Sequence, residues 1–242
     1  MAARPWSHIA ILNRDDPLLP IPQQLHCLRP HPYQHLGAPY GAAASPFQLR
    51  SAVIKRLIEP QDQLQQRQPG WALAIFDAWR PLAVQRFMVA HSIAEECRSR
   101  GLDPLTATAA ALAEVTAAVG RFWAPPSDNP ATPPPHSTGA AVDLTLLDAA
   151  GAVVDMGSAI DVIGAVSEPD HFRQRADQEP QSLQRQQWLR FDQRRRLLQA
   201  VMEAAGFAQH PNEWWHFSYG DQLWAWRRGE PAALYGRCSD EG

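Results

Sequence analysis

The sequence predicts an α+β fold in which helices flank a small antiparallel sheet. Two observations indicate this class. Several long segments repeat apolar residues at helical spacing, whereas several short apolar runs are bounded by turn residues, as buried strands are. The chain shows no internal repeat that would indicate a solenoid or a propeller.

Helices are expected in four parts of the chain. Ser45-Pro46 is typical of an N-cap followed by the first helical residue, so a helix is predicted over 46–66, broken or weakened at Pro60. Further helical patterns cover residues 82–100, 105–122 and 188–205. Gly101 and Gly206 stand where two of these helices are expected to stop.

Strands are expected where apolar or aromatic residues cluster between turns. The runs cover residues 71–76, 142–147, 152–156 and 207–219. The turn Asp148-Ala149-Ala150-Gly151 predicts a hairpin between the second and third of them. Loops are expected in the Pro-rich residues 1–30, in the two-glycine segment 33–41 and in the polar segment 164–186, which is expected at the surface. Arg194-Arg195-Arg196 is predicted to lie on a solvated helix face.

Length and composition indicate one globular unit. The 242 residues, 45% hydrophobic and 19% charged, can bury a sizeable core. We divide the chain into a Pro-rich N-terminal arm, residues 1–24, and a single domain, residues 25–242. The net charge of −3 disfavours nucleic acid as a partner, and no apolar run is long enough to span a membrane. Residues 1–16 lack the apolar core of a secretory signal, so a cytoplasmic location is expected. No feature specifies an oligomeric state.

The residues that could carry chemistry begin with the stretch Pro135 to Leu146. It places His136 and Asp143 seven residues apart, with a small-residue turn at Gly139 between them. Residues at an odd offset on one straight strand face opposite sides, and a turn lets His136 fold back beside Asp143. His216 is the best third ligand. Two histidines and one aspartate can hold zinc and leave one position for water. Three scattered cysteines, without a CxxC pair, disfavour a thiolate site or a disulfide scaffold.

Two further residues complete this hypothesis. Glu213, three residues before His216, is the expected general base. Arg80, beyond the predicted strand 71–76, is expected to stabilise an oxyanion, a contribution of about 3–4 kcal/mol in comparable sites. Structural alternatives exist for single residues: Glu213 as a solvated charge, or Arg80 as the ion-pair partner of Asp77. Weaker ligand candidates are His31, His35, His171 and His210.

Four segments together resemble the D-alanyl-D-alanine dipeptidases of the VanX type. That family belongs to a zinc DD-peptidase clan with the VanY-type carboxypeptidases and the Hedgehog zinc domain. The segments are Asp77-Ala78-Trp79-Arg80-Pro81, His136 to Leu146, Met156 to Asp161 and Glu213-Trp214-Trp215-His216. Their order and spacing agree, and the resemblance covers roughly residues 25–236.

The resemblance implies zinc-dependent hydrolysis of the small dipeptide D-Ala-D-Ala by a metal-activated water. One Zn²⁺ per chain would be held by His136, Asp143 and His216, with Glu213 as general base and Arg80 as oxyanion stabiliser. The resemblance also implies that Asp161 receives the free ammonium group of the substrate. A blocked N-terminus would leave that carboxylate without its partner.

Two departures from the family concern substrate recognition. Pro134 stands where the family often has serine, and Gln34-His35-Leu36-Gly37 replaces a segment that usually has Asn-Phe before its glycine. A zinc peptidase of the same fold with another small peptide as substrate therefore remains an alternative. A second alternative is a non-catalytic, zinc-stabilised binding module, which would need neither Glu213 nor Arg80.

Overall fold

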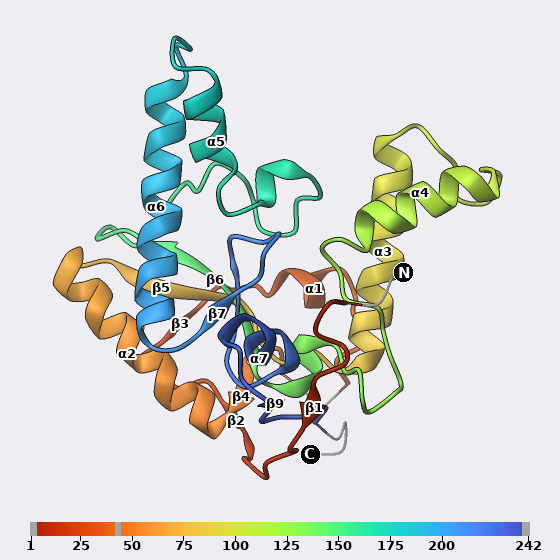
Figure 1. The fold of residues 1–242 in the computed structure, drawn as a ribbon, viewed down its shortest axis with the longest axis horizontal. Helices are drawn as coiled ribbons and strands as arrows, with labels where there is room; N and C mark the ends of the chain where they lie inside the picture. The colour runs from red at the N-terminus through yellow and green to blue at the C-terminus, as the bar shows by residue number, and fades with distance from the viewer. Residues whose placement is uncertain (1–3, 42–44, 239–242) are drawn as a thin grey trace.

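Five strands form the central sheet of the computed structural model, which describes residues 4–41 and 45–238 (Figure 1). In spatial order β3-β5-β6-β8-β7, they are His26–Cys27, Ala72–Asp77, Ala141–Leu147, His216–Ser218 and Ala208–Gln209. The pairs are antiparallel except β3 with β5, which is parallel. The predicted α+β class is confirmed, and one parallel pair makes the sheet mixed.

Helices flank this sheet. The α-helices α1 to α7 are Pro32–His35, Ser51–Arg67, Leu82–Ser99, Ala109–Val119, His171–Gln178, Arg185–Ala204 and Gln222–Arg228. The 3₁₀ helices are η1, Pro135–Thr138, and η2, Ala165–Ser167. In Figure 1, α5 lies alongside α6 and extends away from the sheet, while α3 and α4 form a second projection on the other side. No helix within the described residues is long and apolar enough to cross a membrane.

Two smaller sheets tie the N-terminal arm to the rest of the chain. β1, Ala10–Ile11, pairs in parallel with β9, Ala232–Ala233, and β2, Leu18–Pro20, pairs antiparallel with β4, Gln48–Arg50. The expectation of irregular structure throughout residues 1–30 was therefore wrong at these strands and at β3. Residues 33–41, expected as a loop, begin within the short helix α1.

Alternation along β6 separates the core from the polar face of the sheet. Val142, Leu144 and Leu146 point to one side, where they pack with apolar residues of α2 and α6 in the main core. Ala141, Asp143 and Thr145 must point to the other side, because successive side chains of a strand alternate. The apolar positions thus fix which face of the sheet is left for chemistry.

The helix predicted over 46–66 begins later than expected. Residues 48–50 form β4 instead, because they pair with β2 and because the Arg50 amide donates to the Gly139 carbonyl at 2.9 Å. Pro60 lies inside α2 and does not end it. Val53, Leu57 and Leu64 are fully buried on that helix. Their packing outweighs the cost of about 3 kcal/mol that proline imposes within a helix.

The hairpin after β6 is shorter than predicted. The turn at 148–151 forms, but its return segment pairs with β6 at one isolated bridge, between Leu147 and Val153. Beyond this bridge, arginines of α6 donate to the backbone carbonyls of the return segment. Arg194 donates to the Asp155 carbonyl at 2.6 Å and Arg195 to the Met156 carbonyl at 2.8 Å. Arg195 is buried, so the prediction of a solvated face for the arginine run was wrong at this residue.

Three other segments differ from their predictions. The helix expected over 105–122 spans the shorter range of α4, and the polar segment 164–186 contains η2 and α5. Within α5, Phe172 is buried against Phe191 of α6. The strand expected over 207–219 is two short strands, β7 and β8, because Pro211-Asn212 turns the chain between them.

Gly157 provides a test of how tightly α5 and α6 hold the loop that follows the hairpin. Its φ is +85°, and an added Cβ would lie closer than 3.0 Å to ring atoms of Phe172 and Phe191. Gly151 has a similar φ of +78° but open space around it. We expect Gly157→Ala to lower the free energy of unfolding by about 1–3 kcal/mol more than Gly151→Ala does. Urea denaturation of both variants measures this difference, and equal losses would show that the rings move aside without cost.

Candidate active site

The sheet register brings three polar residues together. Asp143 of β6 lies opposite Asp77 of β5 on one side and opposite His216 of β8 on the other. A bulge between Ile75 and Asp77 shifts the register of β5. Directly paired residues on neighbouring strands face the same side of a sheet. Asp143 and His216 therefore share the face opposite the main core, and both are buried.

His136 reaches this face from η1, the turn before β6. Gly139 ends η1 with a φ of +68°, the left-handed conformation that a turn at this point requires. The His136 Nδ1 lies 2.6 Å from the Ala78 carbonyl oxygen. The Arg80 amide donates in turn to the His136 carbonyl at 3.2 Å, and the Ser137 hydroxyl donates to the Arg80 carbonyl at 2.8 Å. The predicted fold-back of His136 beside Asp143 is confirmed.

His216 is held by a chain of hydrogen bonds at its other ring nitrogen. Its Nε2 lies 3.3 Å from the Ser218 hydroxyl, which donates to the Asp221 carboxylate at 2.7 Å. Because the serine proton points to Asp221, the serine oxygen accepts from His216 Nε2. In the neutral ring, this leaves Nδ1 as an acceptor.

The same reasoning applies to His136 and shows that the site fits a cation. A carbonyl can only accept, so His136 Nδ1 donates to Ala78 and Nε2 of the neutral ring is an acceptor. This Nε2 lies 3.1 Å from His216 Nδ1, and the two nitrogens lie 3.2 and 3.0 Å from the Asp143 carboxylate. One ligand atom from each of the three residues lies within 4.8 Å of the others. Lone pairs that face one another in a buried site form a donor set that could hold a metal ion.

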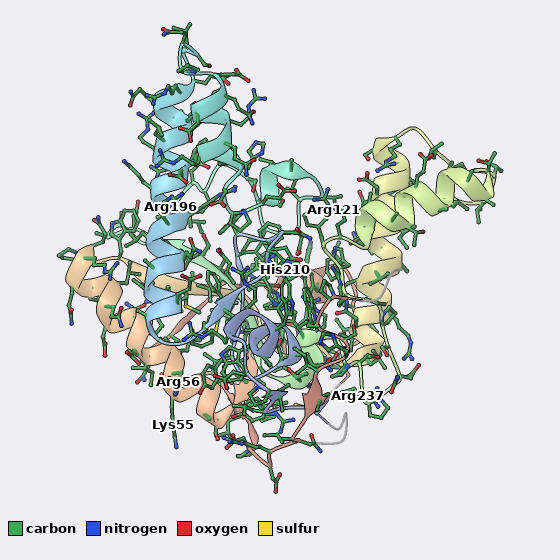
Figure 2. All side chains as sticks on the ribbon, in the orientation of Figure 1. Lys55, Arg56, Arg121, Arg196, His210 and Arg237 are labelled. Atoms are coloured by element: carbon green, nitrogen blue, oxygen red, sulfur yellow. The ribbon has the colours of Figure 1, made fainter. Side chains whose placement is uncertain are left out.

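Glu213 lies beside this donor set, in the turn between β7 and β8. Its carboxylate is 3.8 Å from His216 Nδ1 and 3.2 Å from His210 Nδ1. Burial raises the pKa of Glu213 well above its usual range, and the negative Asp143 raises it further. Burial lowers the pKa of His210, so that ring is neutral beside Glu213. Figure 2 shows His210 near the centre of the molecule.

Arg80 is fixed by a buried ion pair with Asp77. Its Nε and Nη2 donate to one Asp77 oxygen at 3.0 and 2.6 Å, and its Nη1 donates to Gln85 at 2.9 Å. The guanidinium carbon lies 5.1 and 4.8 Å from the ring centroids of Tyr33 and Trp123. Burial alone would lower the pKa of Arg80, but Asp77, Tyr33 and Asp143 act together in the opposite direction, so the pKa is raised. The pairing that we kept as a structural alternative is present, and it lies inside the site.

Asp77 is held in turn from the far side. His31 Nε2 lies 3.1 Å from its second oxygen, and the Tyr40 hydroxyl donates to the same oxygen at 3.2 Å. His31 is thus a buried partner of Asp77, a role that its position in a Pro-rich segment does not indicate.

Asp161 lies in the same pocket as His136, Asp143 and Glu213. Its φ of +67° is uncommon for a residue other than glycine, and aspartate is among those that tolerate it. The Tyr33 hydroxyl donates to its carboxylate at 2.6 Å. Burial, and next the negative Asp143, raise the pKa of Asp161 to about 7. The three predicted ligands, Glu213, Arg80 and Asp161 are therefore all brought together around one pocket.

Sequence reasoning missed several lining residues. Arg4 and Trp6 of the N-terminal arm line the pocket together with Trp123, which follows α4. His210 was rated a weak ligand candidate, and the structure places it against Glu213 rather than among the ligand atoms. Its spacing of three residues from Glu213 is the signal that could have revealed this contact. Nothing in the local sequence around Arg4 indicates that it reaches the pocket.

Two imidazoles, a carboxylate and an adjacent glutamate, buried on one sheet face, form the type of site that zinc hydrolases use. Comparison with known proteins identifies the family. A family profile described as D-ala-D-ala dipeptidase matches residues 26–230. The chain belongs to this family of peptidases.

The chain is also similar to individual proteins. A D-alanyl-D-alanine dipeptidase of Synechocystis sp. is 44% identical over 242 residues, which cover 97% of this chain and 96% of the relative. A D-alanyl-D-alanine dipeptidase of Escherichia coli is 38% identical over 82 residues, 34% of this chain and 36% of that protein. A solved structure of a mutant of the vancomycin resistance D,D-pentapeptidase VanY, in complex with Zn(II), is 19% identical, with 88% of each chain covered and a TM-score of 0.36.

The Asp77–Arg80 pair generates a prediction about stability. Asp77→Ala leaves the buried Arg80 and His31 without their shared partner, so we expect a loss of about 3–5 kcal/mol in the free energy of unfolding. Asp128→Ala removes the partner of Arg86 in an exposed pair and should leave stability unchanged. Chemical denaturation of the two metal-free variants measures the contrast. A small effect at Asp77 would mean that Arg80 turns to Asp143, 3.5 Å away.

Proposed function

We propose that this protein is a zinc-dependent dipeptidase that hydrolyses D-alanyl-D-alanine. The main support is the convergence of the His136, Asp143 and His216 acceptor atoms beside Glu213, in a chain of the D-Ala-D-Ala dipeptidase family. The relative from Synechocystis that carries this activity in its name matches nearly the whole chain.

The three convergent residues would hold one Zn²⁺ per chain. His136 would bind through Nε2 and His216 through Nδ1, because the other nitrogen of each ring donates to Ala78 and Ser218. When bound, zinc would lower the pKa of a water molecule to ~7 and would polarise the carbonyl of the scissile peptide bond.

Glu213 is the general base in this proposal. It takes a proton from the attacking water and then delivers it to the amine that leaves. The contact with His210 at 3.2 Å fixes the orientation of its carboxylate.

Arg80 stabilises the negative charge that develops on the carbonyl oxygen. A guanidinium has five N–H groups, and three bonds, to Asp77 and Gln85, hold it in place. The remaining N–H groups are free to donate to the oxyanion. A pre-positioned donor of this kind contributes about 3–4 kcal/mol in comparable sites.

Asp161 binds the free ammonium group of the substrate. The carboxylate lies within the pocket. Within the described residues, the hydrogen bond that it accepts from a side chain comes from the Tyr33 hydroxyl, at 2.6 Å. A substrate ammonium supplies the positive charge that compensates a buried carboxylate. An acylated N-terminus supplies none, so peptides with a blocked N-terminus are rejected.

The decisive experiment compares two substrates with protein that holds one equivalent of zinc. We expect release of D-alanine from D-Ala-D-Ala and none from N-acetyl-D-Ala-D-Ala. Asp161→Ala should reduce this preference for a free N-terminus, whereas Asp155→Ala, outside the pocket, should retain it. Cleavage of the blocked peptide by the parent enzyme would indicate a carboxypeptidase. No cleavage of either substrate, with zinc bound, would contradict the proposed activity.

The separate roles of base and ligands predict different losses. Glu213→Gln should lower kcat by about 10²- to 10⁴-fold while one zinc ion per chain stays bound, because the amide cannot accept the proton. His216→Ala should lose the metal, whereas His210→Ala, which removes a buried histidine of the same segment, should keep it. Elemental analysis and turnover of D-Ala-D-Ala measure both effects. Full zinc occupancy in His216→Ala would exclude that residue as a ligand.

A further inference from the structure

Arg4 of the N-terminal arm lines the same pocket as the proposed ligands, Glu213 and Asp161. It is the first residue of the described chain. The other residues that line the pocket lie far from it in the sequence, except Trp6, and no motif around Arg4 predicts that it reaches them. Trp6 anchors this part of the arm, because it is buried with its ring centroid 5.6 Å from His210 and 5.3 Å from Trp226.

The guanidinium of Arg4 is incompletely paired. Its Nη1 donates to the Arg121 carbonyl oxygen at 3.1 Å, and Figure 2 labels Arg121 beyond the end of α4. Its Nε is buried and has no hydrogen-bond partner among residues 4–41 and 45–238. Within the same residues, no carboxylate oxygen forms an ion pair with Arg4 at 4.0 Å or less. A buried charged donor without a partner costs free energy that an arriving anion can recover.

The contrast with Arg80 shows which arginine can accept a carboxylate ligand. Asp77, at 2.6 Å, already neutralises Arg80 and raises its pKa. For Arg4 the balance is reversed: burial lowers its pKa, and the more distant charge of Glu213 compensates only in part. Of the two arginines that line the pocket, Arg4 therefore brings the uncompensated positive charge.

A free dipeptide carries two charges at neutral pH, an ammonium at one end and a carboxylate at the other. Asp161 serves the ammonium in the proposed function, which leaves the carboxylate without a partner. We infer that Arg4 binds the C-terminal carboxylate of the dipeptide and so makes the N-terminal arm a specificity element of the active site. This inference rests on the proposed function. Arginine is suited to the role, because its planar fork can donate two parallel N–H bonds to one carboxylate.

The pair of assignments predicts that the site selects substrates by length. A longer peptide extended at either end would place an uncharged amide where one of these two charges needs a counter-charge. Asp161 would reject extension at the amino end, and Arg4 would reject extension at the carboxyl end. The site would then accept dipeptides with both ends free.

The test compares D-Ala-D-Ala with its C-terminal amide, which keeps the ammonium group and loses the carboxylate. The zinc-loaded parent enzyme should prefer the acid. Arg4→Gln should lower kcat/KM on the acid by about 10- to 100-fold, mostly through KM, because it removes a charged hydrogen bond to the bound substrate. On the amide, parent and variant should have the same kcat/KM. Arg4→Lys, which keeps the charge but loses the fork, should retain part of the preference.

Arg14→Gln is the matched control, since Arg14 is an exposed arginine of the same arm that does not line the pocket. It should leave both substrates unaffected, and thermal unfolding should confirm that each variant is folded. An equal loss on acid and amide in Arg4→Gln would overturn the inference and assign Arg4 to Glu213 or to arm packing. A parent enzyme that cleaves the amide as fast as the acid would also overturn it while leaving the dipeptidase intact. Cleavage of neither substrate by the parent would instead refute the proposed function, and the inference with it.

Discussion

The pairing of β5, β6 and β8 sets Asp77, Asp143 and His216 side by side across the sheet, and the rest of the site depends on that register. A slip of one residue would turn Asp143 toward α2 and α6 and would bring Val142 or Leu144 to the polar face. The apolar alternation of β6 prevents this slip, because its leucines and valine fill the main core. The same residues that stabilise the fold therefore determine where the chemistry is located.

Buried charge is the main cost of this arrangement. Asp77 and Arg80 compensate each other, and His31 and Tyr40 complete the hydrogen bonding of Asp77. The carboxyl groups of Asp143, Glu213 and Asp161 lie in one pocket, where burial, and next the negative Asp143, raise the pKa of the other two. A pocket with this excess of carboxylate is suited to cationic occupants, which are a metal ion near Asp143 and an ammonium group near Asp161 in the proposed function.

The parts of the site that the sequence predicts are those with short-range patterns. His136, Gly139 and Asp143 lie in one turn and strand. The spacing of three residues between Glu213 and His216 can be read from the sequence before the fold is known. The contacts of His31 with Asp77 and of Arg195 with the loop 156–168 could not be predicted, because they join segments that are 46 and 27 to 39 residues apart. The arginine run shows the same limit: helical periodicity places Arg195 on α6, but the burial of one arginine depends on carbonyls that the hairpin leaves unpaired.

The proposed metal-binding residues and the proposed substrate-binding residues come from different kinds of structure. His136, Asp143 and His216 lie on or next to sheet strands, whose register allows little displacement. Asp161 lies on a loop that Arg195 holds, and Arg4 lies on the arm that Trp6 anchors. Loops and arms tolerate substitution better than strands, so substrate choice can change while the ligand set stays intact. The departures at Pro134 and in residues 34–37 both fall outside strands, in agreement with this division. In the proposed function, a change of dipeptide preference would therefore require no change in the sheet.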